Sequence, residues 1–470
     1  MGINKTQLPL IVFMGALSLL TGLSGSSTTL ALPKISLEFA VSNSTATWVV
    51  TVGLIVTSIL LVMFGHVGDL LSKSTVFMIG SVLFLAGSLV TGLAPTFYVL
   101  LTGRFIQAVG TAMIMANSMG IISDHFTSDT RAEALAAISM FTSLGTISGP
   151  AFGGFLISWA SWRWIYLFNV PAGLLILLFG YHTLKIVRPK KKDVATIWRN
   201  ANWTGQNLFT VGVILFFISG TFLGNANTRL WGLIGVALGL TVTIYSFIQD
   251  GHAPSPWIDP SLLHNPDYMI SILTLLIVML VNAISNILLP FYLQSYLGLP
   301  AFASGLIMML QSFTMLFITP IAGYLADHWN RYNLTVLGLI ALIISQIGYA
   351  LYPLHQNNWL IIWPIVVNGI GMGLFLSPNN ALTMDTVPKH LAGVAGSLNS
   401  FARTFGMTIG VSFGAMLMFA QLPGIARITP ATGAKFVPAF ANVFWLGTML
   451  SFVGLVIVIY RLYRMKKRTH

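Results

Sequence analysis

Long apolar stretches, bounded by polar or turn-forming residues, follow one another along almost the whole sequence. Fourteen of them reach about 20 residues, the length that a helix needs to cross a bilayer. The larger polar segments, at about 187–203, 250–266 and 421–438, are too short to fold as domains. The pattern therefore predicts an all-α integral membrane protein with 14 transmembrane helices. The predicted spans are 8–32, 46–66, 75–94, 97–122, 132–158, 164–186, 204–224, 230–249, 268–296, 302–325, 333–353, 358–383, 391–420 and 439–461.

The composition agrees with this prediction and excludes soluble classes of protein. Of the 470 residues, 56% are hydrophobic and 7% are charged, whereas a soluble protein carries about 25% charged residues. Water could not solvate the surface of a globule with so few charges, so a soluble enzyme, a nucleic-acid-binding protein and a disordered chain are excluded. The absence of cysteine excludes disulfides, thiolate catalysis and Cys-based metal sites. We expect no cofactor, no metal site and no enzymatic activity.

The basic residues predict the orientation in the membrane. With a cytoplasmic N-terminus, the cytoplasmic loops and tails hold sixteen of the 23 Lys and Arg residues, and the outer loops hold five. Lys and Arg are enriched on the cytoplasmic side, so both termini are predicted to be cytoplasmic in a cell-membrane protein. The net charge of +12 follows from this bias and does not indicate nucleic-acid binding. The basic runs Pro189–Lys192 and Arg461–Arg468 are interpreted as topology determinants, with anionic-lipid binding as the alternative.

The sequence also resembles itself at an offset of about 260 residues. The segment Gly65–Lys73 matches Gly323–Arg331, and Asp124 matches Asp385 at nearly the same offset. Spans 1–6 therefore correspond to spans 9–14, and spans 7 and 8 are an inserted pair. The glycines that match are Gly145, Gly149 and Gly153 with Gly406, Gly410 and Gly414.

This repeat predicts the domain organisation. We expect an N-terminal six-helix half at 1–186, a linker with two inserted transmembrane helices at 187–266, and a C-terminal six-helix half at 267–470. Two repeats around a central cavity are the frame of alternating-access carriers.

At these residues the chain resembles the major facilitator superfamily, and in particular its fourteen-span drug:proton antiporter branch. The segment Gly145–Gly154 matches the span 5 motif G-x-x-x-G-P-x-x-G-G in full. Trp162–Pro171 resembles the signature W-R-W-x-F-x-x-N-x-P, and Leu101–Gly110 resembles the span 4 motif R-x-x-Q-G. Gly65–Lys73 resembles the loop motif G-x-L-A-D-R-x-G-R-K. The resemblance implies the major facilitator fold and an exporter of the multidrug-resistance type.

Departures from the family pattern bear on coupling. Leu70 and Ser72 replace the usual Arg and Gly of the loop motif. Ser24 stands where this branch often carries an Asp that is linked to proton or cation handling. All eleven acidic residues fall in loops or at span ends, whereas Arg104 and Arg403 fall inside spans. Proton coupling therefore stays open, and a neutral or anionic substrate is favoured over a dication.

Polar residues inside the spans are candidates for the substrate cavity. An arginine inside a span costs about 2.5–3.5 kcal/mol on insertion scales, so Arg104 should face water or bond to other helices. Hydroxyls of span 1 and amides of span 9 recur at helical spacing, although ordinary bonding to backbone carbonyls is an equal alternative. The predicted cavity residues are Ser24, Ser27, Thr28, Arg104, Gln107, Asn282, Asn286, Gln311, Asn379 and Arg403.

A second group of residues is predicted to act in gating. Asp69 with Lys73, and Asp327 with Arg331, lie at cytoplasmic span ends and form the predicted inner gate, the alternative being solvated loop pairs. The span 5 motif supplies a pliable contact between the halves, because glycines let helices approach closely and proline kinks the span. Plain helix packing is compatible with this role. The motif residues are Gly145, Gly149, Pro150, Gly153 and Gly154.

The sequence thus predicts a secondary active exporter of small amphipathic compounds that works by alternating access. A carrier of a lipid or an anionic metabolite is the alternative. The chain lacks the G-x-x-x-x-G-K-[ST] loop of ATP-driven proteins, and it lacks the clustered His, Asp or Glu of an intramembrane enzyme. A membrane receptor that does not transport is a further alternative. The expected partners are a small-molecule substrate and membrane lipid, with protons left open, no nucleic acid, and a monomeric protein.

Overall fold

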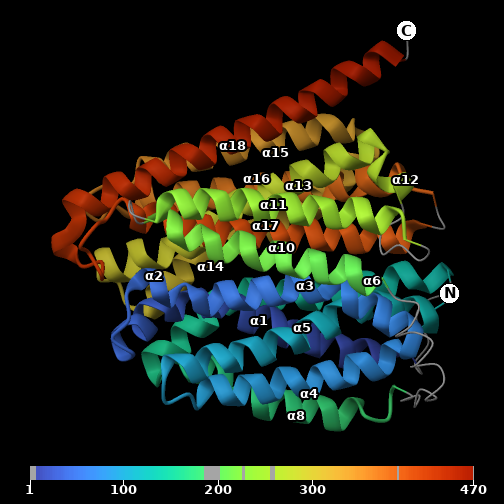
Figure 1. Ribbon diagram of the computed structural model, residues 1–470, viewed down its shortest axis with the longest axis horizontal. Helices are drawn as coiled ribbons and strands as arrows, with labels where there is room; N and C mark the ends of the chain where they lie inside the picture. The colour runs from blue at the N-terminus through green and yellow to red at the C-terminus, as the bar shows by residue number, and fades with distance from the viewer. Residues whose placement is uncertain are drawn as a thin grey trace.

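The computed structural model describes residues 7–126, 128–184, 202–224, 228–253, 260–388 and 391–468. Within them every regular element is a helix, and the long helices lie side by side along the longest axis of the molecule (Figure 1). Thirteen helices are long and apolar enough to cross a membrane. The remaining predicted span, 164–186, corresponds to a shorter apolar helical stretch at Trp164–Gly180. The described residues thus account for the fourteen predicted spans with thirteen long helices and one short one.

The helices form two sets and an inserted pair. The first set consists of α1 (Leu8–Glu38), α2 (Asn43–Ala46), α3 (Trp48–Leu71), α4 (Lys73–Gly92), α5 (Phe97–His125), α6 (Ser128–Trp159), α7 (Trp164–Leu167) and α8 (Asn169–Gly180). The inserted pair is α10 (Trp203–Thr221) and α11 (Arg229–Gly251), with η1 (Phe222–Gly224) between them and α12 (Pro260–Leu263) after them. The second set consists of α13 (Pro266–Pro290), η2 (Phe291–Tyr296), α14 (Ala301–His328), α15 (Arg331–Ala350), α16 (Asn358–Asp385), α17 (Ala392–Ala420), η4 (Pro430–Thr432) and α18 (Gly433–Arg468).

Polar side chains begin several helices at the point where an apolar stretch starts. Thr96 Oγ1 accepts the N–H of Val99 at the start of α5, and Asn265 Oδ1 accepts the N–H of Tyr268 at the start of α13. The first N–H groups of a helix have no partner within it, and lipid offers none, so these bonds define the ends. Some helices continue past the apolar stretch, as α1 does to Glu38.

Packing within the first set recurs in the second. Helix α1 packs on α6 as α13 packs on α17, α4 packs on α5 as α15 packs on α16, and α3 packs on α5 as α14 packs on α16. Two further pairs join the sets, α3 with α17 and α6 with α14. These pairs are equivalent, because the repeat relates α3 to α14 and α6 to α17. The whole arrangement therefore has an approximate two-fold relation.

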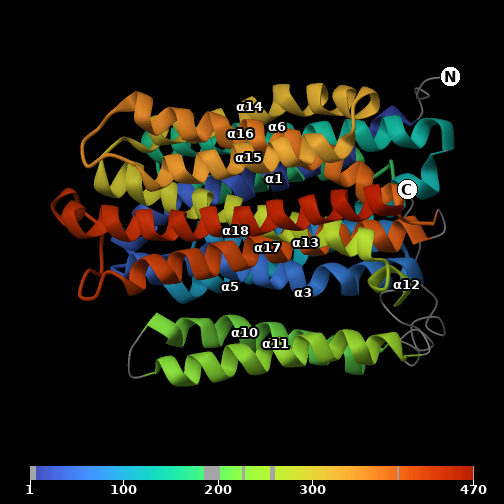
Figure 2. The ribbon, with the colours of Figure 1, turned by 90° about the horizontal axis from the view of Figure 1, so that it is seen from above.

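The inserted pair lies beside this bundle. Helices α10 and α11 pack mainly on each other and form a separate layer along one side (Figure 2). Helix α10 reaches the bundle at α3 and α17. The apolar cluster at this junction includes Ile55 of α3, Phe209 of α10 and Phe401 of α17. The inserted pair therefore covers one of the two lines along which the sets meet.

The two ends of the bundle are packed differently. We call the end where α1 begins and α18 ends the terminal end, and the opposite end the far end (Figure 1). At the far end a single apolar cluster joins both sets, with Leu32 of α1, Leu288 of α13 and Phe440 of α18 among its members. Toward the terminal end, α1, α4, α5, α6 and α8 form one cluster, whereas α13, α15, α16 and α18 form another. The sets thus share one apolar cluster at the far end, whereas toward the terminal end most of their buried apolar residues pack in separate clusters. The exception is the cluster beside the inserted pair, which joins α3 to α10, α13 and α17.

Candidate functional site

The charge of Arg104 on α5 is surrounded by neutral groups of the first set. Its Nε donates to the Val49 carbonyl oxygen of α3 at 2.8 Å, and its Nη1 donates to Oε1 of Gln107 at 2.5 Å. The guanidinium carbon lies 5.6 Å from the centre of the Tyr166 ring. Arg104 is 9% exposed, so these groups replace the water that a buried cation loses. Of the two predicted alternatives, facing water and bonding to other helices, the structure shows a bond to the backbone of α3.

Gln107 extends this arrangement into a buried polar network. Its Nε2 donates to the hydroxyl oxygens of Ser24, at 3.3 Å, and Ser88, at 2.8 Å. Asn169 Nδ2 donates to the same two oxygens at 3.0 and 3.3 Å. The network joins α1, α4, α5 and α8. Sequence reasoning did not single out Ser88 or Asn169, although Asn169 belongs to the tryptophan signature, because one polar residue in a span gives no periodic signal.

The hydroxyls of Ser27 and Thr28 are buried against other helices of the first set. Ser27 Oγ donates to the Gly149 carbonyl oxygen of α6 at 2.6 Å, and Thr28 Oγ1 accepts from the Tyr166 hydroxyl at 3.3 Å. Gly25, by contrast, is exposed, and a Cβ there would meet no atom within 4 Å. The face of α1 that carries Gly25 therefore borders open space. A substrate role for Ser27 and Thr28 stays a prediction.

Two of the predicted amide residues of the second set meet each other. Gln311 Nε2 on α14 donates to Asn282 Oδ1 on α13 at 2.6 Å, and both helices belong to the second set. Asn286 donates to the Asn282 carbonyl oxygen at 3.1 Å and is half-buried. Asn379 is separate from this group, because it is buried and donates to the Ser271 carbonyl oxygen at 3.3 Å. The structure therefore brings together Asn282, Asn286 and Gln311.

Arg403 on α17 differs from Arg104 in its surroundings. It is half-buried, and among the described residues it has no hydrogen bond or ion pair. On one flank, a Cβ at Gly406 would lie 2.5 Å from the Leu276 carbonyl oxygen of α13. On the other flank, the hydroxyls of Thr408 and Ser58 of α3 are 3.0 Å apart. Arg403 thus occupies the face of α17 between α13 and α3, where the two sets adjoin.

The basic residues of the predicted gate pair with acids that the repeat also relates. Lys73 Nζ lies 3.1 Å from Asp124 Oδ2, at the terminal ends of α4 and α5. Arg331 forms the equivalent ion pair with Asp385, at the terminal ends of α15 and α16. Each pair stays within one set. Sequence reasoning found the match between Asp124 and Asp385 but did not assign them as the partners.

Some predicted positions lie outside the part that the structure describes. The side chains of Asp69 and Asp327 are among them, and so is the basic run Pro189–Lys192. Their roles stay predictions. In the other basic run, Arg464 Nη2 donates to Asp267 Oδ1 of α13 at 2.7 Å, which ties the end of α18 to the second set.

The first glycines of the span 5 motif pack α6 tightly on α1. A Cβ at Gly145 would lie 2.1 Å from the Leu19 carbonyl oxygen, and a Cβ at Gly153 would lie 2.6 Å from Cβ of Ser27. Gly149, between them, also contacts α1. Neither helix could approach this closely with a side chain at these positions. These three glycines therefore pack inside the first set, which corrects the expected contact between halves.

The last part of the motif does contact the second set. A Cβ at Gly154 would lie 2.5 Å from the Ala301 carbonyl oxygen of α14. A Cβ at Gly305 of α14 would lie 2.2 Å from the Pro150 carbonyl oxygen. Backbone therefore meets backbone where α6 crosses α14. The predicted contact between the halves corresponds to Pro150 and Gly154.

Hydrogen bonds reinforce the seal at the far end. Gln294 Nε2 of η2 donates to the Leu30 carbonyl oxygen of α1 at 3.1 Å. The N–H of Phe302 on α14 donates to Ser158 Oγ of α6 at 3.1 Å. Both bonds join the first set to the second. They fix the two sets together at the end where the shared apolar cluster also lies.

These features define a multi-pass membrane protein made of two similarly packed helix sets, with polar and charged groups between its spans. Residues 14–411 match the Major Facilitator Superfamily, and the chain belongs to this family. Members of the family are transporters, so the protein is a transporter and not an enzyme. The predicted fold class, an all-α membrane protein with the major facilitator fold, is confirmed.

Similar curated proteins agree on transport and differ in substrate. The riboflavin transporter RibZ of Clostridioides difficile is 26% identical over 93% of this chain and 94% of its own length. The multidrug resistance protein Stp of Mycobacterium tuberculosis is 27% identical over 91% of this chain and 80% of its own. The multidrug transporter protein MdtP of Bacillus subtilis is 24% identical over 85% of this chain and 73% of its own.

Proposed function

We propose that the protein is a secondary active exporter of small amphipathic compounds that works as a monomer in the cell membrane. The observation that carries the proposal is the packing that recurs between the two sets, with equivalent pairs of helices joining them. In this proposal 1–186 and 267–470 are halves that rock against each other, and 187–266 carries the inserted pair. The multidrug resistance proteins among the relatives support an amphipathic substrate.

The bias of basic residues orients this transporter with both termini in the cytoplasm. The far end is then the outer side, and the terminal end is the cytoplasmic side. Because the sets are sealed at the far end, the structure corresponds to the arrangement that faces the cytoplasm. A tag placed after His470 should be protected from external protease in intact cells. Cleavage of that tag in intact cells would reverse the orientation.

The proposed substrate cavity lies between the sets. On the side of the first set, the face of α1 that carries Gly25 borders open space. On the side of the second set, Asn282 and Gln311 form a hydrogen-bonded amide pair. Arg403 supplies a cation that no described residue neutralises. The buried hydrogen-bond network around Arg104 holds the helices of the first set together behind this face of α1. Substrate would thus meet amide groups, a cation and an open helix face.

The isolated Arg403 also favours a second candidate function. A cation inside the membrane needs a counter-charge or water, and an anionic substrate would supply the counter-charge. The described carboxylates lie at helix ends. They therefore do not replace the acid that the fourteen-span branch often carries in span 1, at the position where this chain has Ser24. A carrier of a lipid or an anionic metabolite fits this pattern. The riboflavin transporter among the relatives supports a substrate that is not a multidrug cation.

A flux assay tests both candidates. The purified full chain, in proteoliposomes with an imposed pH gradient, should move at least one compound of a panel of cationic, neutral and anionic amphipathic dyes. Gly25→Ala should keep this flux, whereas Gly25→Trp should block the open face and abolish flux without preventing folding. Binding of dyes without flux under any gradient would indicate a receptor and overturn the proposal.

A further inference from the structure

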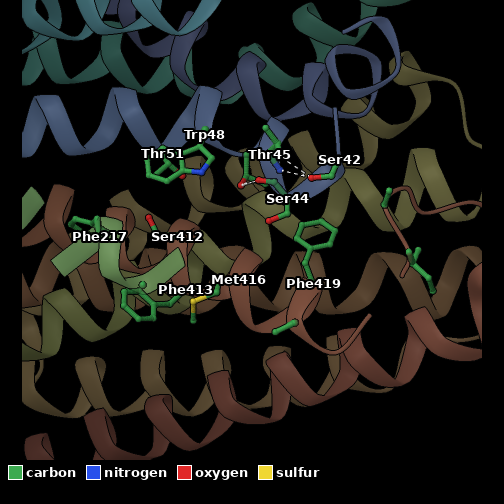
Figure 3. A pocket seen from close by; sticks show the side chains of 15 residues that line it. Ser42, Ser44, Thr45, Trp48, Thr51, Phe217, Ser412, Phe413, Met416 and Phe419 are labelled. Carbon is green, nitrogen blue, oxygen red and sulfur yellow. Dashed lines mark hydrogen bonds between the residues drawn. The ribbon is translucent and has the colours of Figure 1, made fainter. Parts of the chain in front are cut away.

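A pocket of about 310 Å³ opens at the far end, where both sets and the inserted pair meet. Trp48 and Thr51 of α3 form one wall, and Ser412, Phe413 and Met416 of α17 form the opposite wall (Figure 3). Helix α10, the segment around α2 and the loop after α17 contribute the remaining sides. The pocket is therefore assembled from three parts of the chain that are far apart in sequence.

This pocket is separate from the proposed substrate cavity. Ser412 follows Arg403 on α17 by about two and a half helical turns, so the two residues lie on opposite faces of the helix. Arg403 lies between α13 and α3. The Ser412 face instead adjoins Phe217 of α10, which also lines the pocket. The inserted pair, which the central cavity does not use, thus takes part in this site.

Two hydroxyls in the walls have no partner among the described residues. Thr51 is 4% exposed and its hydroxyl forms no described hydrogen bond. The hydroxyl oxygen of Ser412 is buried and also lacks a partner. Other hydroxyls of the pocket are already bonded, since Thr47 donates to the Ser44 carbonyl oxygen at 2.7 Å. A buried hydroxyl without a partner costs about 1–3 kcal/mol. A ligand that bonds to Ser412 would recover this loss, and the Thr51 hydroxyl offers a second bond on the opposite wall.

The rest of the lining defines the chemistry of that ligand. None of the fifteen lining residues is Asp, Glu, Lys, Arg or His, so an ion that left water for this pocket would find no counter-charge. Aromatic rings and a methionine side chain favour a flat apolar body. The volume is near the lower end of the range of about 300–1,000 Å³ for small-molecule sites.

We propose that this pocket binds a neutral aromatic molecule of two or three rings with hydrogen-bonding groups at its edge, and that occupancy keeps the outer side closed. The bound molecule contacts α3 of the first set and α17 of the second. Nearby, the N–H of Asn43 in α2 donates to the Ala426 carbonyl oxygen in the loop after α17 at 3.0 Å, which also joins the first set to the second. Opening the far end separates these walls, so the ligand binds the closed arrangement more tightly and shifts the population toward it.

Thiol labelling of the full chain tests the site, because the protein has no cysteine of its own. Ala420→Cys places a thiol in the lining, and Ala160→Cys places one on an exposed position at the far end of α6. With 7-methoxycoumarin at about four times its Kd, labelling of Ala420→Cys by an impermeant maleimide should slow about fivefold by mass action. Labelling of Ala160→Cys should not change.

Variants of the walls show whether protection comes from this site. In the Ala420→Cys background, Thr51→Val with Ser412→Ala should abolish the protection. Thr57→Val is the matched control, because its hydroxyl donates to the Gly53 carbonyl oxygen outside the pocket. Coumarin-3-carboxylate should give no protection. Absence of protection by 7-methoxycoumarin, equal protection by the anion, or protection that survives the double substitution would each overturn the proposal. Labelling requires no transport, so the site is tested independently of the exporter function.

The effect on opening is measured with a second reporter. Thr29 lies one helical turn beyond Gly25 on α1, toward the far end, and is 8% exposed. In right-side-out vesicles, 7-methoxycoumarin should lower the external labelling of Thr29→Cys about fivefold at the same occupancy. The decrease should vanish with Thr51→Val and Ser412→Ala. If the pocket is occupied and the labelling of Thr29→Cys does not change, the proposal that occupancy keeps the outer side closed is wrong.

Discussion

At the scale of single residues, the two interior arginines differ in how their charge is accommodated. Arg104 donates to Val49 and Gln107, whereas Arg403 has no described partner. A lysine cannot reproduce the fork of donors that a guanidinium offers. Arg104→Lys should therefore lower the free energy of unfolding by about 1.5–3 kcal/mol. Denaturant unfolding of the purified protein measures this change.

Arg403→Lys is the matched control for that prediction. It keeps the charge and breaks no described hydrogen bond, so its unfolding free energy should stay within about 0.5 kcal/mol of the wild-type value. An equal loss in both variants would contradict the difference between the two environments. A loss in Arg403→Lys alone would indicate that Arg403 has the structural role assigned here to Arg104.

The limits of sequence reasoning are clearest at this scale. Helical spacing grouped Ser24, Ser27 and Thr28 correctly on one side of α1, yet it could not say what that side faces. The structure buries them against α5, α6, α7 and α8, and leaves Gly25 at the open face. In a helix with apolar residues on all sides, polarity does not distinguish a packed face from a cavity face. Glycine carries no chemical signal for a cavity, so Gly25 was missed.

At the scale of helices, close packing through glycine is the feature that both sets share. A Cβ at Gly410 on α17 would lie 2.1 Å from the Leu280 carbonyl oxygen of α13. The two backbones cannot move apart without opening a cavity, so Gly410→Ala should lower the unfolding free energy by about 1–3 kcal/mol. Gly396→Ala on the same helix is the control, because its Cβ would meet only Cε of Met384 at 3.9 Å. Equal stability of the two variants would refute the packing argument.

The predicted gate also belongs to this scale, since it concerns the terminal ends of helices, which are cytoplasmic in the proposed orientation. Asp69→Asn and Asp327→Asn should impair transport while leaving membrane insertion intact, because they weaken the outward-facing arrangement. Maleimide labelling of Gly25→Cys from the cytoplasmic side should then increase. The control is Asp124→Asn, which removes an exposed pair worth under about 1 kcal/mol and should insert normally. Unchanged labelling in both gate variants would remove the basis for the gate.

The helices themselves were predictable, because each span needs a long apolar stretch and the repeat relates the two sets. The short helix α2 was not predicted, since Ser42 to Thr47 contains mostly polar residues of the kind found in loops. Its start depends on a local bond, in which Ser42 Oγ accepts the N–H of Thr45 at 3.0 Å. The sequence also could not predict that Gly145 and Gly153 pack against α1. Glycines in the sequence predict that two helices pack closely, whereas the identity of the partner helix follows from the tertiary arrangement.

At the scale of the whole molecule, the distribution of charge limits what the transporter can carry. The described carboxylates lie at the ends of helices, and Arg104 and Arg403 lie between them in the spans. Each elementary charge that crosses gains or loses about 2.3 kcal/mol per 100 mV. An inside-negative potential therefore favours export of an anion and opposes export of a cation that moves without exchange. In the proposed anion carrier, Arg403 would lower the cost of bringing the anion into the membrane interior.

We therefore predict that transport of an anionic dye responds to membrane potential, with a gradient of about 50-fold at 100 mV for one uncompensated charge. Arg403→Gln should lower anion flux about tenfold or more, because a hydrogen bond to a charged group is worth about 1.5–3 kcal/mol. Arg403→Lys should retain most of the flux, and neutral dyes should be little affected. Potential and pH gradient are imposed separately in vesicles. Strong proton-driven export of a dicationic dye, unchanged in Arg403→Gln, would contradict the prediction and place the protein with proton-coupled cation exporters.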